Sequence, residues 1–204
     1  NVGSLPKPRP LYGQEKLANS NPDFVLITEG EKCTAALQSL GFIAVTSIGG
    51  SKQVEHADWS AIKGFKEVII IPDNDEPGAE YAKSVCGILS KLEPALKINI
   101  LNIPNLPKKG DIVDWLQPRI PDWDGYSPID SNIYLNVRDE LLELIETKSE
   151  PISKEWLEMS LEWPNPIDLE SITNIPWPED ALPIVLNDFI NSVAESTETP
   201  KDMA

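Results

Sequence analysis

The sequence is poor in the side chains that bind zinc or form disulfides. Its 204 residues include two cysteines, Cys33 and Cys86, and one histidine, His56. A structural zinc site takes four such ligands, so these three side chains are too few to build one. Both cysteines also fall in patterns that indicate helix interiors. We therefore expect no zinc in this chain.

Long apolar runs are missing as well. No stretch reaches the roughly 18 apolar residues that indicate a membrane-spanning helix. The N-terminal residues NVGSLPKPRP also lack the apolar core of a signal peptide. The hydrophobic content of 41% is still enough for one well-filled domain. The sequence therefore predicts a soluble, cytoplasmic protein that makes no membrane contact.

Basic residues are scarce, but unevenly so. The formal charge of −16 argues at first sight against nucleic-acid binding, because phosphate contacts need Lys and Arg. Residues 118–204 carry five basic and nineteen acidic side chains, whereas residues 24–117 carry nine and twelve. The middle of the chain can therefore still present a local phosphate-binding surface.

Four short apolar runs organise the middle of the chain. They cover residues 24–28, 42–48, 67–71 and 97–103, and helical patterns lie after them at 31–40, 78–92 and 111–116. Runs that are apolar throughout are typical of parallel strands buried on both faces. The expected fold class is α/β: a four-stranded, mainly parallel sheet flanked by helices and followed by an acidic, mostly helical or irregular C-terminal segment.

Composition divides the chain into four parts. Residues 1–22 are Pro-rich and are expected to form an extended arm, and residues 23–117 hold the sheet. Residues 118–175 are interpreted as an acidic, Pro/Trp-rich linker with helices, one of them in YLNVRDELLELIETK. Residues 176–204 begin a further segment with a helix around 182–195. The acidic part is either a solvated linker or a cover for a basic neighbour or for the nucleic-acid face.

Carboxylates follow three of the four expected strands. Glu29 comes after the first strand, Asp73 and Asp75 come after the third, and Asp111 follows the fourth. Ligands of parallel sheets bind beyond the carboxyl ends of the strands, and residues i and i+2 of an extended stretch point the same way. Clustered carboxylates raise each other's pKa unless cations are bound, and oxygen-only ligands favour Mg²⁺ or Mn²⁺. These acids therefore indicate a metal site.

Asp73 and Asp75 have two other interpretations. The stretch DNDEPG has acids at the first and third positions of a calcium loop and glycine at the sixth, but Pro77 and Ser84 do not fit the fifth and twelfth. The calcium-loop hypothesis therefore fails. Alternatively, Asp75 or Glu76 caps the helix that follows, which is common at strand-to-helix turns. This alternative stays open.

Lysines and glycines near the acids fit phosphate. Lys32 follows GE at the start of a helix, and Lys52 follows Gly49 and Gly50, whose backbone N–H groups can approach an anion closely. The alternative for each lysine is a solvated surface charge. Neither EGEKCT nor IGGSK has the spacing of a Walker A loop, so the sequence does not encode a P-loop ATPase.

Together these motifs resemble the Toprim domain of primases, topoisomerases and some nucleases. The resemblance covers residues 23–117, and TEGEKCTAAL, IGGSK, PDNDEPG and KGDIVDWL look most like phage, plasmid and primase-helicase enzymes. It implies a Rossmann-like Toprim fold and metal-dependent synthesis of RNA primers on a single-stranded DNA template from ribonucleoside triphosphates, during DNA replication. The stretch WPEDALPIVLNDFINSVAEST resembles the segment that precedes a helicase-like ATPase, which implies a helicase-like domain or subunit as partner.

The resemblance also implies roles for single residues. Glu29 matches a glutamate that binds metal or acts as acid and base, Asp73 and Asp75 match a metal-binding D-x-D pair, and Asp111 matches a later acidic position. Two Mg²⁺ or Mn²⁺ ions are implied. The residues implied to contact phosphate or nucleotide are Lys32, Gly49, Gly50 and Lys52.

The sequence departs from a full primase. No zinc-binding module, basic template-binding subdomain or helicase is recognisable in it. Because the chain also begins at Asn rather than Met, we expect a fragment of a longer protein that does not necessarily act alone. Two alternatives are a Toprim nuclease and a non-catalytic scaffold that binds Mg²⁺ or nucleic acid. A topoisomerase is disfavoured, because none of the four tyrosines has an evident active-site context.

Overall fold

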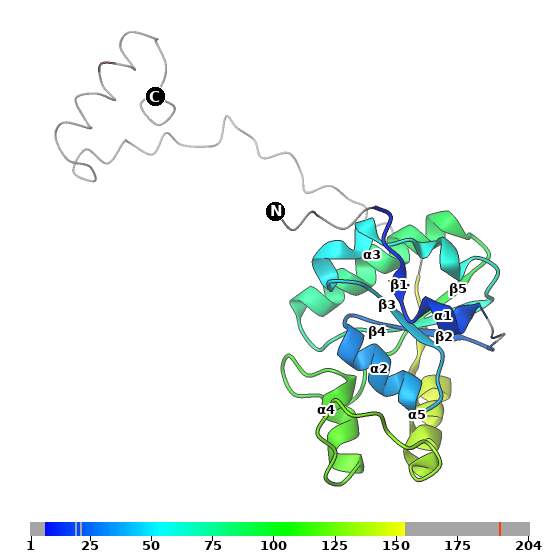
Figure 1. Ribbon diagram of the computed structural model, residues 1–204. Coiled ribbons are helices and arrows are strands. Elements are labelled where there is room, and N and C mark those ends of the chain that lie inside the picture. Colours follow the sequence, from blue (N-terminus) through cyan, green and yellow to red (C-terminus); the bar gives the residue numbers. More distant parts are fainter. Residues whose placement is uncertain (1–6, 19, 21, 154–191, 193–204) are drawn as a thin grey trace. The chain divides into compact units, whose positions relative to one another are not determined.

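The computed structural model of the protein describes residues 7–18, 20, 22–153 and 192 (Figure 1). The helices expected after residue 153, and nearly all of the 176–204 segment, lie outside these residues. Within the described part, no helix is long and apolar enough to cross a membrane.

A sheet of six strands, in the order β1-β3-β2-β4-β5-β6, forms the centre of the fold. The four inner strands are parallel, and they are β3 (Ala44–Ser47), β2 (Val25–Thr28), β4 (Glu67–Ile71) and β5 (Lys97–Ile100). The edge strands β1 (Leu11–Tyr12) and β6 (Glu150–Pro151) pair antiparallel with β3 and β5. The predicted α/β fold with a mainly parallel sheet is confirmed, but the prediction of four strands is wrong. Strands of two residues carry no periodicity that a sequence can reveal.

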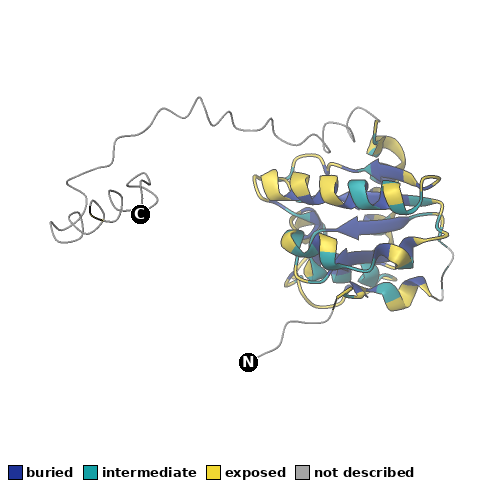
Figure 2. Cartoon of the chain, turned by 90° about the horizontal axis from the view of Figure 1, so that it is seen from above, coloured by how far each residue is buried: buried dark blue, intermediate teal, exposed yellow. Residues whose placement is uncertain are grey.

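Two hydrophobic cores cover the two faces of the sheet. One core lies under α2 (Glu31–Ser39), α4 (Ile112–Leu116) and α5 (Leu135–Lys148). The other lies under α1 (Gln14–Leu17), α3 (Glu76–Leu92) and the short helices η1 (Ser51–His56) and η2 (Trp59–Ile62). Successive strand residues alternate between the cores, so Leu26 belongs to the first and Val25 to the second. Figure 2 shows the buried strands between exposed helical surfaces.

The helix α3 begins at Glu76, two residues before the predicted start. Asp75 supplies the N-cap and Pro77 lies in the first turn, where its missing N–H costs nothing. Its buried face includes Tyr81, which is 1% exposed, whereas Ala79 in its first turns is exposed. Ala79 instead lines a cavity, described below.

Segments on both sides of the predicted domain pack onto it. Leu11 and Leu17, in the stretch expected to be an extended arm, are buried in the second core. On the other side, Val137, Leu141 and Ile145 of α5 are buried in the first core, and the 3-10 helix η3 (Gln117–Arg119) connects α4 to the loop before α5. The buried side chains of α5 therefore belong to the same core as strands of the predicted domain 23–117.

Candidate active site

The acidic residues meet at one edge of the sheet because of strand register. Thr28 and Ile71, the last residues of β2 and β4, are paired across the parallel sheet. Glu29 follows Thr28 directly, and Asp73 follows Ile71 after one proline. Both side chains therefore leave neighbouring strands at their carboxyl ends, where parallel sheets bind ligands.

Asp73 has the most perturbed carboxyl group of this edge. Burial, followed by the negative charges of Glu29, Asp111 and Asp75, raises its pKa to about 7, and Lys32 opposes this rise. The charge of a neighbouring acid raises the pKa of Asp73 only when that acid lies close to it. The structure therefore places Glu29, Asp75 and Asp111 within electrostatic range of Asp73.

Glu29 presents an unsatisfied oxygen to the site. Its Oε2 atom is buried and has no hydrogen-bond partner among the described residues. Burial raises the pKa of this carboxyl, a hydrogen bond with Ser51 lowers it, and the charge of Asp75 raises it. A buried carboxylate oxygen without a partner is unfavourable, so it fits a position that a cation or a donor completes.

Asp75 and Asp111 already have a structural task. Asp75 Oδ1 accepts a hydrogen bond from the Gly78 N–H at 2.9 Å, which confirms the interpretation of Asp75 as the cap of α3. Asp111 Oδ1 accepts from the N–H groups of Val113 and Asp114 and caps α4 in a reciprocal capping box. These two residues each use one carboxylate oxygen to hold a helix.

The donor set fits a hard divalent cation in its chemistry. All four acids offer carboxylate oxygens, the ligands that Mg²⁺ and Mn²⁺ prefer. One of these oxygens, Oε2 of Glu29, has no hydrogen-bond partner among the described residues. Within the part of the chain that the structure describes, however, no three His, Cys, Asp or Glu side chains are arranged as the ligand shell of an ion. The side chains would have to converge further to coordinate one.

Three of the four residues predicted to contact phosphate already bind other groups of the protein. Lys32 Nζ lies 3.1 Å from Asp111 Oδ2. The Gly49 N–H donates to Glu31 Oε1 at 3.0 Å, so a carboxylate occupies the place expected for a phosphate. Gly50 N–H donates to the Ser47 carbonyl at 3.4 Å. Lys52 is exposed on η1, and its side chain makes no hydrogen bond or ion pair with the described residues.

Asn74, between the two aspartates, was missed by sequence reasoning. Its side-chain Nδ2 donates to the carbonyls of Leu106 and Pro107, both at 3.0 Å. Its backbone N–H donates to the carbonyl of Gly110, and its carbonyl accepts from the N–H of Lys109. Asn74 therefore ties the end of β4 to the loop that leads into Asp111. In the sequence, only the position of Asn74 inside the D-x-D motif could have indicated that it has a role near the site.

Gly78 is a second residue that the sequence did not single out for the site. A Cβ atom at this position would lie 2.3 Å from the carbonyl oxygen of Asp73 and 2.8 Å from its nitrogen. Because both contacts are with backbone, a larger residue would push α3 away from Asp73. Glycine thus permits the close approach that sets the position of Asp73 relative to α3.

Comparisons with known proteins agree with this architecture. Residues 26–116 match the Toprim-like family, a stretch that includes every acid of the cluster. A DNA primase domain of Pseudomonas aeruginosa superposes with a TM-score of 0.52 at 17% identity, over 78% of this chain and 44% of that one. The Aquifex aeolicus primase, with its zinc-binding and RNA polymerase domains, gives a TM-score of 0.44 at 19% identity, over 78% and 36%. No curated protein matches the sequence.

The chain spans less than half the length of either solved primase chain. At such low identity the superposition on the Pseudomonas aeruginosa domain concerns the fold alone. The family match and the arrangement of the strands nevertheless lead to the same conclusion, and the resemblance seen in the sequence is confirmed. Residues 26–116 match the Toprim-like family, and the fold of the chain is similar to that of a primase domain.

Proposed function

We propose that this chain is the Toprim part of a primase or primase-helicase, and that it transfers nucleotides during the synthesis of RNA primers on single-stranded DNA. The observation that carries the proposal is the carboxyl group of Asp73, whose pKa rises to about 7 among three other acids. Acids held together at a ligand-binding edge favour a cation site. Nucleotidyl transfer is a reaction that such sites promote.

Glu29, Asp73 and Asp75 are the proposed catalytic residues and metal ligands, and Asp111 is a further proposed ligand. When bound, Mg²⁺ or Mn²⁺, as two ions, would activate the attacking hydroxyl and neutralise the charge that develops on the phosphate. Glu29 contributes its unpaired Oε2, and Asp75 keeps Oδ1 on the α3 cap while Oδ2 is available.

Lys32, Lys52, Gly49 and Gly50 are the proposed phosphate contacts. Lys32 can turn from Asp111 to a phosphate without leaving the edge of the sheet, because its exposed side chain is flexible. Gly49 becomes available once Glu31 releases its N–H. Binding of a nucleotide therefore exchanges internal carboxylate contacts for phosphate contacts.

The proposed partners are a single-stranded DNA template, ribonucleoside triphosphates and a helicase-like domain or subunit. The acids at the site cannot hold the template themselves, so basic residues must do so. Lys108 and Lys109, exposed in the loop before Asp111, lie on the proper side of the domain for this role. The proposed helicase partner rests on the sequence of residues 176–204 alone.

Primer synthesis tests the proposal directly. The chain is incubated with a single-stranded template, four labelled ribonucleotides and Mg²⁺ or Mn²⁺, and products are resolved by length. We expect short RNA products that disappear with Asp73→Asn and Glu29→Gln. Glu76→Gln is the matched control, because Glu76 is an exposed acid of the same turn that caps nothing and is not a proposed ligand.

The products separate the alternatives. Template degradation without synthesis, lost with the same variants, would indicate a Toprim nuclease. If neither product forms, but Mg²⁺ raises the melting temperature of the wild type and not of Asp73→Asn, the domain is a metal-binding scaffold. Synthesis that survives Asp73→Asn would contradict the assignment of the site.

A further inference from the structure

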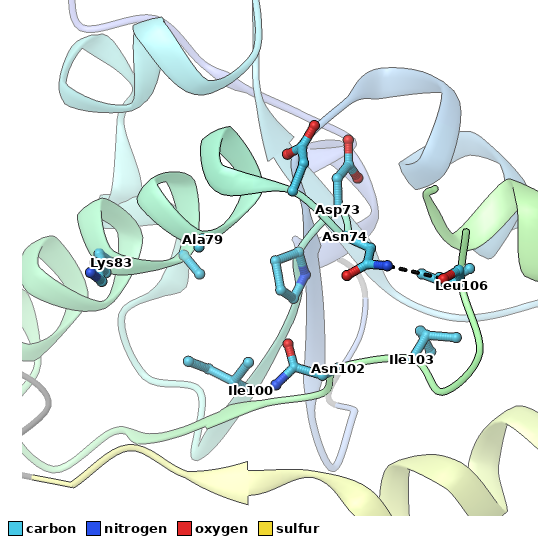
Figure 3. Close-up of a pocket in the computed structure, with 11 residues that line it drawn as sticks. Asp73, Asn74, Ala79, Lys83, Ile100, Asn102, Ile103 and Leu106 are labelled. Atoms are coloured by element: carbon cyan, nitrogen blue, oxygen red, sulfur yellow. Dashed lines mark hydrogen bonds between the residues drawn. The ribbon is translucent and has the colours of Figure 1, made fainter. Parts of the chain in front are cut away.

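A cavity of about 300 Å³ lies beside the acid cluster. It opens to solvent and lies between the first turns of α3 and the segment that follows β5. Figure 3 shows Ala79 and Lys83 of α3 on one side and Ile100, Asn102 and Ile103 on another, with Asp73 next to them. Apart from Asp73 and Asp75 at its edge, no lining residue of this cavity has a role in the function proposed above.

The lining of the cavity combines apolar walls with a few polar groups. The walls come from Pro72, Ile100, Ile103 and Leu106, and from the small side chains of α3. Ligand sites for small molecules have this composition, and their volumes begin at about 300 Å³. The cavity is therefore large enough for a planar ring system with a sugar, but too small for a nucleoside triphosphate together with its metal ions.

Two polar side chains in the lining have free hydrogen-bonding capacity. Asn102 is exposed and offers both a donor and an acceptor at its amide, and Lys83 offers three donors. Neither makes a hydrogen bond or an ion pair with any other residue of the described part of the chain. An amide with both functions can pair with the edge of a nucleobase, as Asn and Gln do with bases in nucleic acids.

The charge at one end of the cavity selects what can enter it. Asp73 and Asp75 belong both to this lining and to the acid cluster. Without a cation, these carboxylates repel a phosphate, but they do not repel an uncharged base or sugar. A nucleotide would therefore place its uncharged base and ribose in the cavity, and its phosphates would reach the acid cluster only with a cation there to offset the charge.

We infer that the cavity is a binding site for the base and ribose of a nucleotide. Asn102 reads the edge of the base, Lys83 donates to a base or sugar oxygen, and Ala79 leaves the space that the ring occupies. This inference rests on the proposed function for the reaction that the nucleotide undergoes. It adds a prediction that the proposed function does not make, namely that uncharged nucleosides bind in the absence of metal.

Nucleoside binding can be measured on the full chain by two-dimensional NMR and equilibrium dialysis. Adenosine, guanosine, cytidine and uridine are added in EDTA, and the backbone and side-chain amide signals of Asn102 and the methyl signal of Ala79 are followed. We expect at least one of the four nucleosides to shift these signals in a saturable way. No saturable shift with any of the four would overturn the inference.

A pair of variants on α3 tests the location. Ala79→Leu places a larger side chain in the cavity, and it should fold because Ala79 is exposed and Leu is a good helix former. Ser84→Leu adds the same side chain at an exposed position of the same helix that does not line the cavity. We expect at least a tenfold loss of nucleoside affinity in Ala79→Leu and no loss in Ser84→Leu. Equal binding by both variants would place the nucleoside elsewhere.

Asn102→Leu tests the recognition step. It removes the amide and keeps a similar volume, so the preference among the four nucleosides should fall to less than twofold. An unchanged preference would remove Asn102 from the site.

The experiments give different results depending on whether this inference or the proposed function is wrong. Primer synthesis with an unchanged KM for nucleotides in Ala79→Leu would refute only the cavity, whereas nucleoside binding without synthesis in wild type would refute only the primase.

Discussion

The ammonium group of Lys32 lies 3.1 Å from Oδ2 of Asp111, so a proposed phosphate contact and a proposed metal ligand are paired with each other. Lys32 stands on α2 and Asp111 caps α4, so the pair spans two helices of the same core. Lys32 also lies 5.8 Å from the ring of Tyr126. In this arrangement Lys32 neutralises the charge of Asp111. When a nucleotide binds with its cations, we expect Lys32 to contact a phosphate and Asp111 to bind a cation instead.

Removing Lys32 should therefore raise the pKa of Asp73 above its present value of about 7, because Lys32 is the group that lowers it. Lys32→Met keeps the length of the side chain and removes only the charge. The titration of the carboxyl carbon of Asp73 by ¹³C NMR, without metal, measures the effect. Lys63→Met, at an exposed position after η2, is the control and should leave this pKa unchanged. A pKa that falls in Lys32→Met would contradict the geometry.

Sequence reasoning found the elements that have local signatures. The runs 25–27 of β2 and 68–71 of β4 are apolar throughout because both faces of these strands are buried, and this is visible without a structure. The placement of Glu29, Asp73 and Asp75 at one edge of the sheet was predicted in the same way, because strand ends in a parallel sheet meet at one edge. The predicted set of acids is thus a consequence of chain order.

Features that depend on long-range contacts could not be found. The hydrogen bond between Glu31 and the Gly49 N–H joins residues on two different segments, and neither segment has a sequence pattern that predicts it.

The helix α5 shows another limit. Its sequence offers more apolar positions than one stripe uses, because the buried stripe is Val137, Leu141 and Ile145, while Leu135 is 53% exposed. A helix with many apolar residues permits more than one stripe, and only packing decides between them.

Because the pKa of Asp73 is raised, replacing its carboxyl group should stabilise the folded protein, and the size of this effect should depend on pH. In the unfolded chain this carboxyl titrates near about 3.9, and in the folded protein at about 7. The folded state therefore loses stability as the pH rises from about 4 to 7, and above pH 7 the loss is complete. Since Asp73 is only half-buried, solvent screening reduces the loss to about 1–2 kcal/mol.

Asp73→Asn should consequently unfold at higher urea concentration than wild type at pH 8 in EDTA, and at the same concentration at pH 4. With Mg²⁺ at pH 8 the difference should shrink, because the cation offsets the charge in wild type only. The free energy of unfolding at the two pH values measures this, and Glu76→Gln serves as control. A destabilisation of Asp73→Asn at both pH values would show that Asp73 is stabilising as a carboxylate.

The two roles of Asp75 can be separated by two substitutions. Asn is as good an N-cap as Asp, whereas Ala removes the bond to the Gly78 N–H. Asp75→Asn should therefore keep the free energy of unfolding in EDTA within about 0.5 kcal/mol, and Asp75→Ala should lose about 0.5–2 kcal/mol. Both should lose the rise in melting temperature that Mg²⁺ causes in wild type. If Asp75→Asn kept that rise, the residue would be a cap and not a ligand.

The helix α5 should stabilise the Toprim-like domain through one buried stripe. Leu141 is fully buried in the core that it shares with α2 and α4, and Leu135 on the same helix is 53% exposed. Leu141→Ala should lower the free energy of unfolding by about 2–5 kcal/mol, because it removes a core side chain and leaves a cavity. Leu135→Ala, the matched control, should change it by no more than about 0.5 kcal/mol. Urea denaturation of both variants measures the difference. Equal, small effects would mean that α5 is a detachable part of the acidic segment, as a solvated linker would be, and that the domain ends at residue 117.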